Sequence, residues 1–147
     1  MLLPDELMGS SSLLDQMARL CESTGGSVVG LKEVPHEEVS AYGVIDPDGE
    51  LDDRGVIAVR DLVEKPKPAD APSDLIIIGR YVLTPDVFEE IARVRPGAGG
   101  EIQLTDAMAK LIGRQPFHGL RFEGRRFDCG DKQGYLEAIV ALALERP

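Results

Sequence analysis

Short apolar runs, separated by turn-forming residues, recur along most of the chain and predict β-strands. Residues 75–83 form the most apolar run and are the best candidate for a central strand, and residues 27–31 form a second short strand. Residues 41–46 and 56–63 flank an Asp-Pro-Asp-Gly turn signal, so we expect them to pair as a hairpin. Residues 117–122 alternate apolar and polar positions in the same way.

Apolar residues recur at helical spacing in the segments between these runs. The first such segment ends at Gly25-Gly26, the second begins at Thr84-Pro85, which suit the N-cap and the first helical position, and the third stops at Gly113. A last helix, from about residue 132 to 145, is expected to present an apolar face made of Tyr135, Leu136, Ile139, Val140, Leu142 and Ala143. Helices that alternate with strands and hairpins predict an α/β fold with a mixed sheet.

Composition narrows the possible partners and compartment. A length of 147 residues suits a single domain spanning residues 1–147, and the net charge of −10 argues against nucleic acid or an anionic membrane surface as partner. No apolar run approaches the roughly 18 residues of a membrane helix. Cys21 and Cys129 lack metal-ligand spacing and are typical of reduced thiols, which favours a cytoplasmic location.

Charged residues stand where several strand-like runs end. Asp5, Glu64-Lys65 and Asp128 each lie beside a turn, and the two aspartates are oxygen donors of the kind that Mg²⁺ prefers. A carboxylate at Glu64 suits sugar hydroxyls and an ammonium at Lys65 suits a phosphate. Alternatively, Glu64 and Lys65 form a solvated pair, and each aspartate is a helix cap.

The corner at Glu64 and Lys65 poses a geometric problem. Pro66 biases Lys65 toward extended backbone, whereas strict strand alternation would send Glu64 and Lys65 to opposite faces. Both side chains can serve one ligand only if the backbone leaves regular strand geometry at Lys65, which the following proline favours.

Other charged groups have simpler interpretations. An acidic cluster invites a calcium-binding hypothesis but lacks the order of an EF-hand loop, and its Asp-Gly step is explained as a turn. Arg80 and Tyr81 fit plain strand packing. His118 and three arginines are expected on a solvated hairpin face. The cluster consists of Asp46, Asp48, Glu50, Asp52 and Asp53, and the arginines are Arg121, Arg125 and Arg126.

Six ordered blocks closely resemble the bacterial UTP–glucose-1-phosphate uridylyltransferases, or UDP-glucose pyrophosphorylases, within the sugar nucleotidyltransferases. They span nearly the whole chain: Leu3-Pro4-Asp5-Glu6-Leu7, Ala41-Tyr42-Gly43-Val44, Val63-Glu64-Lys65-Pro66, Gly79-Arg80-Tyr81-Val82-Leu83, Gly100-Glu101-Ile102-Gln103-Leu104-Thr105-Asp106-Ala107 and Phe127-Asp128-Cys129-Gly130-Asp131-Lys132. The resemblance implies a Rossmann-like nucleotidyltransferase fold and uridylyl transfer from UTP to glucose 1-phosphate.

The resemblance also implies roles by position. Asp5 and Asp128 would hold the catalytic Mg²⁺, and Lys65 would bind the phosphate of the sugar. Glu64 would accept hydrogen bonds from sugar hydroxyls. Three further substrate-binding residues are implied: Gly43 and Gly79 beside the sugar, and Glu101 in a loop that closes over or supports the pocket.

One departure from these enzymes matters for activity. Their glycine-rich loop, which binds the nucleotide triphosphate on the first strand, is absent from this sequence. We therefore expect the C-terminal, sugar-phosphate side of such an enzyme, with little turnover alone. The alternative is a non-catalytic sugar-phosphate-binding or dimerisation domain, and open sheet edges favour a homo-oligomer in either case.

Overall fold

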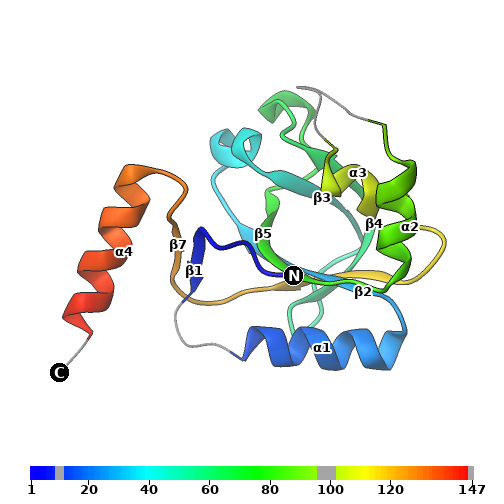
Figure 1. Cartoon of the computed structure of the whole chain (residues 1–147), viewed down its shortest axis with the longest axis horizontal. Coiled ribbons are helices and arrows are strands. Elements are labelled where there is room, and N and C mark those ends of the chain that lie inside the picture. The colour runs from blue at the N-terminus through cyan, green and yellow to red at the C-terminus, as the bar shows by residue number, and fades with distance from the viewer. Residues whose placement is uncertain (9–11, 96–101, 146–147) are drawn as a thin grey trace.

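The computed structural model describes residues 1–8, 12–95 and 102–145. Five strands close into a barrel in the order β2-β5-β3-β4-β6 (Figure 1). Strands β2 and β6 run parallel and the other neighbours antiparallel, so the expected α/β fold with a mixed sheet is confirmed. The strands are β2 (Ser27–Glu33), β3 (Gly43–Asp48), β4 (Val56–Glu64), β5 (Leu75–Val82) and β6 (Phe117–Arg121).

Two further strands and the helices surround this barrel. Strands β1 (Glu6–Met8) and β7 (Arg126–Asp128) form a separate antiparallel sheet. Helix α1 lies along one side of the barrel, α2 and α3 cover another, and α4 stands apart beside β7 (Figure 1). The helices are α1 (Leu13–Thr24), α2 (Asp86–Arg93), α3 (Leu104–Ala109) and α4 (Lys132–Leu144), with two short 3₁₀ helices, η1 (His36–Ala41) and η2 (Pro68–Asp70).

Strand alternation divides the barrel core into two clusters. On β5, Ile76 and Ile78 point toward the cluster that α1 covers, whereas Ile77 between them joins the cluster that includes α2 and α3. Helix α1 contributes Met17 to its cluster and ends where Gly25 adopts a left-handed backbone (φ 67°), as the Gly-Gly pair predicted. Both faces of the central strand are therefore buried.

The predicted hairpin is present as β3 and β4, but its turn lies later than predicted, at residues 49–55, because Pro47 and Asp48 still pair with β4. Members of the acidic cluster stabilise the hairpin. Asp52 accepts hydrogen bonds from the backbone N–H groups of Arg54 and Val56, and Asp46 pairs with Arg60 at 2.7 Å. The Val56 N–H, together with Arg54, lowers the pKa of Asp52. Within the described ranges, no group of three or more His, Cys, Asp or Glu residues is arranged to hold a metal ion, so the calcium hypothesis gains no support there.

Helix α4 differs most from its prediction. Asp131 caps it as expected, accepting from the backbone N–H groups of Gln133 and Gly134. The predicted apolar face is exposed, however, and only Ala138 and Ala141 are buried. The prediction assumed that apolar spacing marks a covered face, but α4 packs against the short strand β7, which leaves most of its apolar side chains exposed. No described helix is long and apolar enough to cross a membrane.

Smaller differences concern two element starts. Helix α2 begins at Asp86 with Pro85 as its N-cap, one residue later than the sequence predicted. The first residues of the chain have the apolar sequence of a buried strand's end and lie beside β5. Leu2 bridges Arg80, and Leu3 donates its N–H to the Gly79 carbonyl, yet both leucines are exposed rather than buried.

Candidate active site

A cavity of about 270 Å³ lies where the β1–β7 sheet meets the barrel. Its wall includes all the predicted site residues that the structure describes, although they come from five separate parts of the chain. These residues are Asp5, Gly43, Glu64, Lys65, Gly79 and Asp128. The remaining predicted site residue, Glu101, lies outside the described residues.

The backbone leaves strand geometry at Lys65. Glu64 ends β4, and the next residue has a φ of 46°, in the left-handed region, with its N–H donating to the Tyr42 carbonyl at 3.0 Å. The expectation of extended backbone at Lys65 is therefore wrong, because the clash with Pro66 excludes the right-handed helical region without requiring an extended one. The left-handed turn brings Lys65 to the same cavity as Glu64, which strand alternation alone would prevent.

The Glu64 carboxylate is held by a residue that the sequence did not single out. The Thr105 hydroxyl, on α3, donates to Oε2 of Glu64 at 2.6 Å. Gly43 pairs with Glu64 across the hairpin, and a Cβ at Gly43 would lie 3.2 Å from the same oxygen. Thr105 belongs to the Glu-Ile-Gln-Leu-Thr-Asp block, so the signal was present, but only Glu101 of that block was assigned a role.

Asp5 and Asp128 are brought together by the pairing of β1 with β7. Glu6 lies opposite Asp128 in this ladder, and the Cys129 N–H donates to the Asp5 carbonyl at 2.7 Å. A Cβ on Gly130 would lie 3.1 Å from Oδ1 of Asp128 and 3.3 Å from Oδ2 of Asp5. The two carboxylates are therefore close neighbours beside Gly130.

A buried arginine supports this pair. Arg126 makes a two-pronged ion pair with Glu6, both side chains are 8% exposed, and its Nη2 lies 3.2 Å from Oδ2 of Asp128. The guanidinium stacks 5.0 Å from the centre of the Tyr42 ring, whose hydroxyl donates to Asp128 at 3.3 Å. Burial alone would lower the pKa of Arg126, but its hydrogen bonds to Glu6 and Tyr42 more than offset this and raise it.

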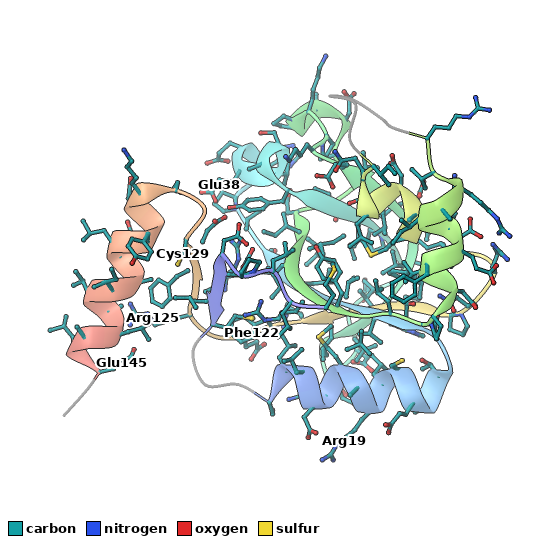
Figure 2. The ribbon with its side chains drawn as sticks, viewed as in Figure 1. Arg19, Glu38, Phe122, Arg125, Cys129 and Glu145 are labelled. Carbon is teal, nitrogen blue, oxygen red and sulfur yellow. The ribbon has the colours of Figure 1, made fainter. Side chains whose placement is uncertain are left out.

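The prediction of a solvated hairpin face is therefore wrong for Arg126. Strand alternation turns it inward against Glu6, which also lies on a three-residue strand. The neighbouring Arg125 is 62% exposed and pairs with Glu145 at the end of α4 (Figure 2), and Arg121 pairs with Glu123. His118 is half-buried, its Nδ1 has no partner among the described residues, and burial lowers its pKa.

Tyr81 and Arg80 depart from the plain packing expected for them. Tyr81 lines the cavity, and burial, reinforced by the carboxylates of Glu64, Glu6 and Asp5, raises its pKa to about 12. Arg80 donates to the Glu6 carbonyl at 2.7 Å, which fastens the N-terminal segment to β5. The cavity wall is therefore rich in carboxylates, and this charge suits a cation and hydroxyl donors.

Gly79 has no side chain, and this leaves room for Leu3 of the N-terminal segment beside the cavity. A Cβ there would lie 2.7 Å from Cβ of Leu3, so a larger residue would push the N-terminal segment away from β5. Asp5 follows two residues after Leu3, and the position of its carboxylate therefore depends on Gly79.

The carboxylates of Asp5 and Asp128 are suitable ligands for a magnesium ion. Both are hard oxygen donors, and both line the cavity that Lys65 also lines. Mg²⁺ is commonly bound by one or two carboxylates, with substrate phosphates and waters in the other positions. A pair of carboxylates is therefore a sufficient protein contribution.

Comparison with known proteins gives the family. The family model described as "Nucleotidyl transferase" matches residues 1–145. The chain is similar to UTP–glucose-1-phosphate uridylyltransferases of Komagataeibacter xylinus (53% identity, 89% of this chain, 46% of the relative) and Streptococcus pneumoniae (47% identity, 99% and 50%). It thus spans about half the length of these relatives.

Solved structures agree with the sequence relatives. A UDP-glucose pyrophosphorylase in complex with UDP-glucose has 43% identity and a TM-score of 0.91, over 99% of this chain and 56% of that one. A UTP-bound enzyme of the same name from Acinetobacter baumannii has 36% identity and a TM-score of 0.85, over 99% and 50%. Matched over nearly its whole length in both sequence and structure, the chain belongs to the nucleotidyl transferase family.

Proposed function

We propose that this chain forms the sugar-phosphate and metal-binding side of an enzyme that transfers a uridylyl group from UTP to glucose 1-phosphate. One observation carries the proposal: Asp5, the Glu64-Lys65 pair and Asp128, from three distant parts of the chain, line one cavity. Its similarity to relatives named for this activity, and to enzymes bound to UDP-glucose or UTP, supports the choice of substrates.

In the proposed reaction, a phosphate oxygen of glucose 1-phosphate attacks the α-phosphorus of UTP. The bond from that phosphorus to the oxygen leading to the β-phosphate breaks, so UDP-glucose forms and pyrophosphate leaves. The attacking phosphate is already ionised, and the reaction needs positioning and charge neutralisation rather than a covalent nucleophile. The exposed Lys65 ammonium would hold the sugar's phosphate, and Glu64 would accept hydrogen bonds from sugar hydroxyls.

Asp5 and Asp128 are the residues that would hold Mg²⁺. When bound, the ion neutralises charge on the phosphates of both substrates. Arg126 and Tyr42 fix Oδ2 of Asp128, and the Gly130 N–H fixes Oδ1 at 3.0 Å, so this carboxylate is oriented before any ligand arrives. Preorganisation of this kind lowers the cost of binding.

Titration of the ¹⁵N-labelled chain with glucose 1-phosphate and Mg²⁺, followed by NMR, tests the sugar-phosphate role. We expect shifts around the cavity, and Glu64→Ala should weaken binding roughly tenfold, because it removes a charged hydrogen-bond acceptor. Glu22→Ala, at an exposed position on α1, is the control and should bind like the unaltered chain. Unchanged affinity in Glu64→Ala would contradict the role of Glu64.

A second candidate function, association of the chain with itself, is favoured by α4. Several large apolar side chains on this helix are about half exposed or more: Tyr135, Leu136, Ile139, Val140 and Leu144. Contiguous exposed apolar surface marks interaction sites, and a homo-oligomer joined through α4 would cover it. Sedimentation velocity over a range of concentrations tests this candidate, and a monomer throughout would contradict it.

The remaining proposals concern the number of domains, the cellular compartment and the classes of ligand. We propose that residues 1–147 act as one domain in the cytoplasm. The cysteines support a cytoplasmic location, because Cys21 and Cys129 are both free thiols. The net charge of −10 supports small phosphorylated molecules, rather than nucleic acid or an anionic membrane, as ligands.

A further inference from the structure

We propose that Thr105 is a positioning residue that sets sugar specificity, because its hydroxyl fixes the Glu64 carboxylate in one orientation toward the cavity. This inference rests on the proposed function, since it assumes that Glu64 recognises a sugar hydroxyl. It adds a residue from α3 to a site otherwise built from strand ends and loops.

The contact itself is short and sheltered from water. Thr105 is 8% exposed, and its Oγ1 donates to Oε2 of Glu64 at 2.6 Å, across a separation of 41 residues. Hydroxyl-to-carboxylate hydrogen bonds at 2.5–2.7 Å are charge-assisted and about twice as strong as neutral ones. A threonine hydroxyl has a single proton, so the bond to Glu64 uses its whole donor capacity.

The remaining oxygen of Glu64 is available to a ligand. Among the residues that the structure describes, Thr105 is the one side chain that donates to this carboxylate, and it uses Oε2. Glu64 is partly exposed and lines the cavity, so Oε1 is free to accept from a hydroxyl group. Thr105 therefore decides which oxygen meets the ligand and at what angle.

Gly43 makes this orientation possible. A Cβ at this position would lie 3.2 Å from Oε2 of Glu64 and 3.6 Å from Oγ1 of Thr105. The carboxylate thus occupies space that a side chain on the opposite strand would otherwise fill. Strand β3 provides the space, β4 provides the acceptor, and α3, which packs on β4, provides the donor.

A fixed carboxylate discriminates between sugars better than a free one. An acceptor held at one angle suits a hydroxyl in one configuration, whereas a rotating carboxylate adjusts to an inverted hydroxyl. Sites built to hydrogen-bond a particular hydroxyl reject analogues strongly, because buried polar groups are otherwise left unpaired. Loss of the Thr105 hydroxyl should therefore weaken binding of the preferred sugar phosphate and reduce discrimination against its epimer.

The test measures dissociation constants of glucose 1-phosphate, galactose 1-phosphate and inorganic phosphate by NMR titration of the chain. Thr105→Val keeps the shape and removes the hydroxyl, and Thr105→Ser restores it. We expect Thr105→Val to bind glucose 1-phosphate roughly five- to tenfold more weakly and to lose much of its discrimination between the two sugars. Inorganic phosphate should bind within about twofold of the unaltered chain, and Thr105→Ser should restore both properties.

A double-mutant cycle separates positioning from a general packing effect. If Thr105 acts through Glu64, Thr105→Val should add less than about twofold in a Glu64→Ala background. Full additivity, or equal weakening of inorganic phosphate, would overturn the inference while leaving the proposed function intact. If the unaltered chain does not bind glucose 1-phosphate, the proposed function fails as well. Should Thr105→Val not fold, Thr105→Ala measures the same loss.

Discussion

The barrel and the arm formed by β1, β7 and α4 both contain large apolar side chains, which are buried in the barrel and exposed on α4. Leu31 on β2 is fully buried, whereas Leu136 on α4 is 61% exposed. Helices cover the barrel on two sides, while α4 stands apart beside β7 (Figure 1). An apolar pattern therefore indicates what an element is able to bury, and the packing around it decides what is buried.

The contacts that join the arm to the barrel differ in kind from those that hold the barrel together. The barrel is held by apolar packing, whereas polar contacts attach the arm to it, such as Tyr42 with Arg126 and Asp128, and Arg80 with the Glu6 carbonyl. The cavity lies at this junction, taking carboxylates from the arm and Glu64 and Lys65 from the barrel. The geometry of the site thus depends on how firmly the arm is attached.

The largest effect is expected from Arg126→Met, which removes the buried ion pair between β1 and β7 and the stack of Arg126 on Tyr42. It leaves the Glu6 carboxylate buried without its partner, and removing one member of a buried ion pair costs about 3–5 kcal/mol of unfolding free energy. Urea unfolding measures this loss. Arg125→Met is a matched control, because that arginine is exposed in a surface pair and its loss should cost less than about 1 kcal/mol. Equal losses in the two variants would contradict the importance of the buried pair.

Leu31→Ala and Leu136→Ala compare the two regions directly. Leu31 is buried between strands of the barrel, so truncation should cost about 2–5 kcal/mol of unfolding free energy through lost burial and a cavity. Leu136 is largely exposed, and its truncation should change that free energy by less than about 0.5 kcal/mol. A large loss for Leu136→Ala at low protein concentration would mean that α4 is covered.

The smallest effect concerns Tyr81, where carboxylates of both regions act on one phenol. Its pKa of about 12 lies above the ordinary value of 10, so between these pH values the folded chain keeps a proton that the unfolded chain releases. Stability should therefore fall as pH rises from 10 to 12. Ultraviolet titration measures this ionisation, and Tyr81→Phe should remove the late component. In Arg126→Met, detachment of the arm should move the pKa back toward 10.

Most of the barrel was predictable because its signals are local. Apolar runs indicated the strands and Gly25 the end of α1, whereas the β3–β4 hairpin was predicted with its turn too early, because Pro47 and Asp48 pair within β3. The closure of β2, β5, β3, β4 and β6 into a ring was not predictable, since it depends on pairings between strands distant in sequence.

The site was predictable to a similar extent. Strand ends and the family resemblance together identified six residues that line one cavity: Asp5, Gly43, Glu64, Lys65, Gly79 and Asp128. Thr105 and Arg126 were missed, since their importance comes from contacts made across 41 and 120 residues. Neither contact leaves a periodic signal in the sequence, although Thr105 lies in a block that carries the family resemblance.

Lys65 shows a conflict between stability and chemistry at a single position. Its left-handed backbone suits glycine and costs a lysine about 1 kcal/mol or more. Glycine would relieve that cost but would remove the cation that the proposed function requires. The most favourable residue for folding is therefore the least useful one for binding a phosphate. Selection for stability alone would therefore favour replacement of Lys65 by glycine.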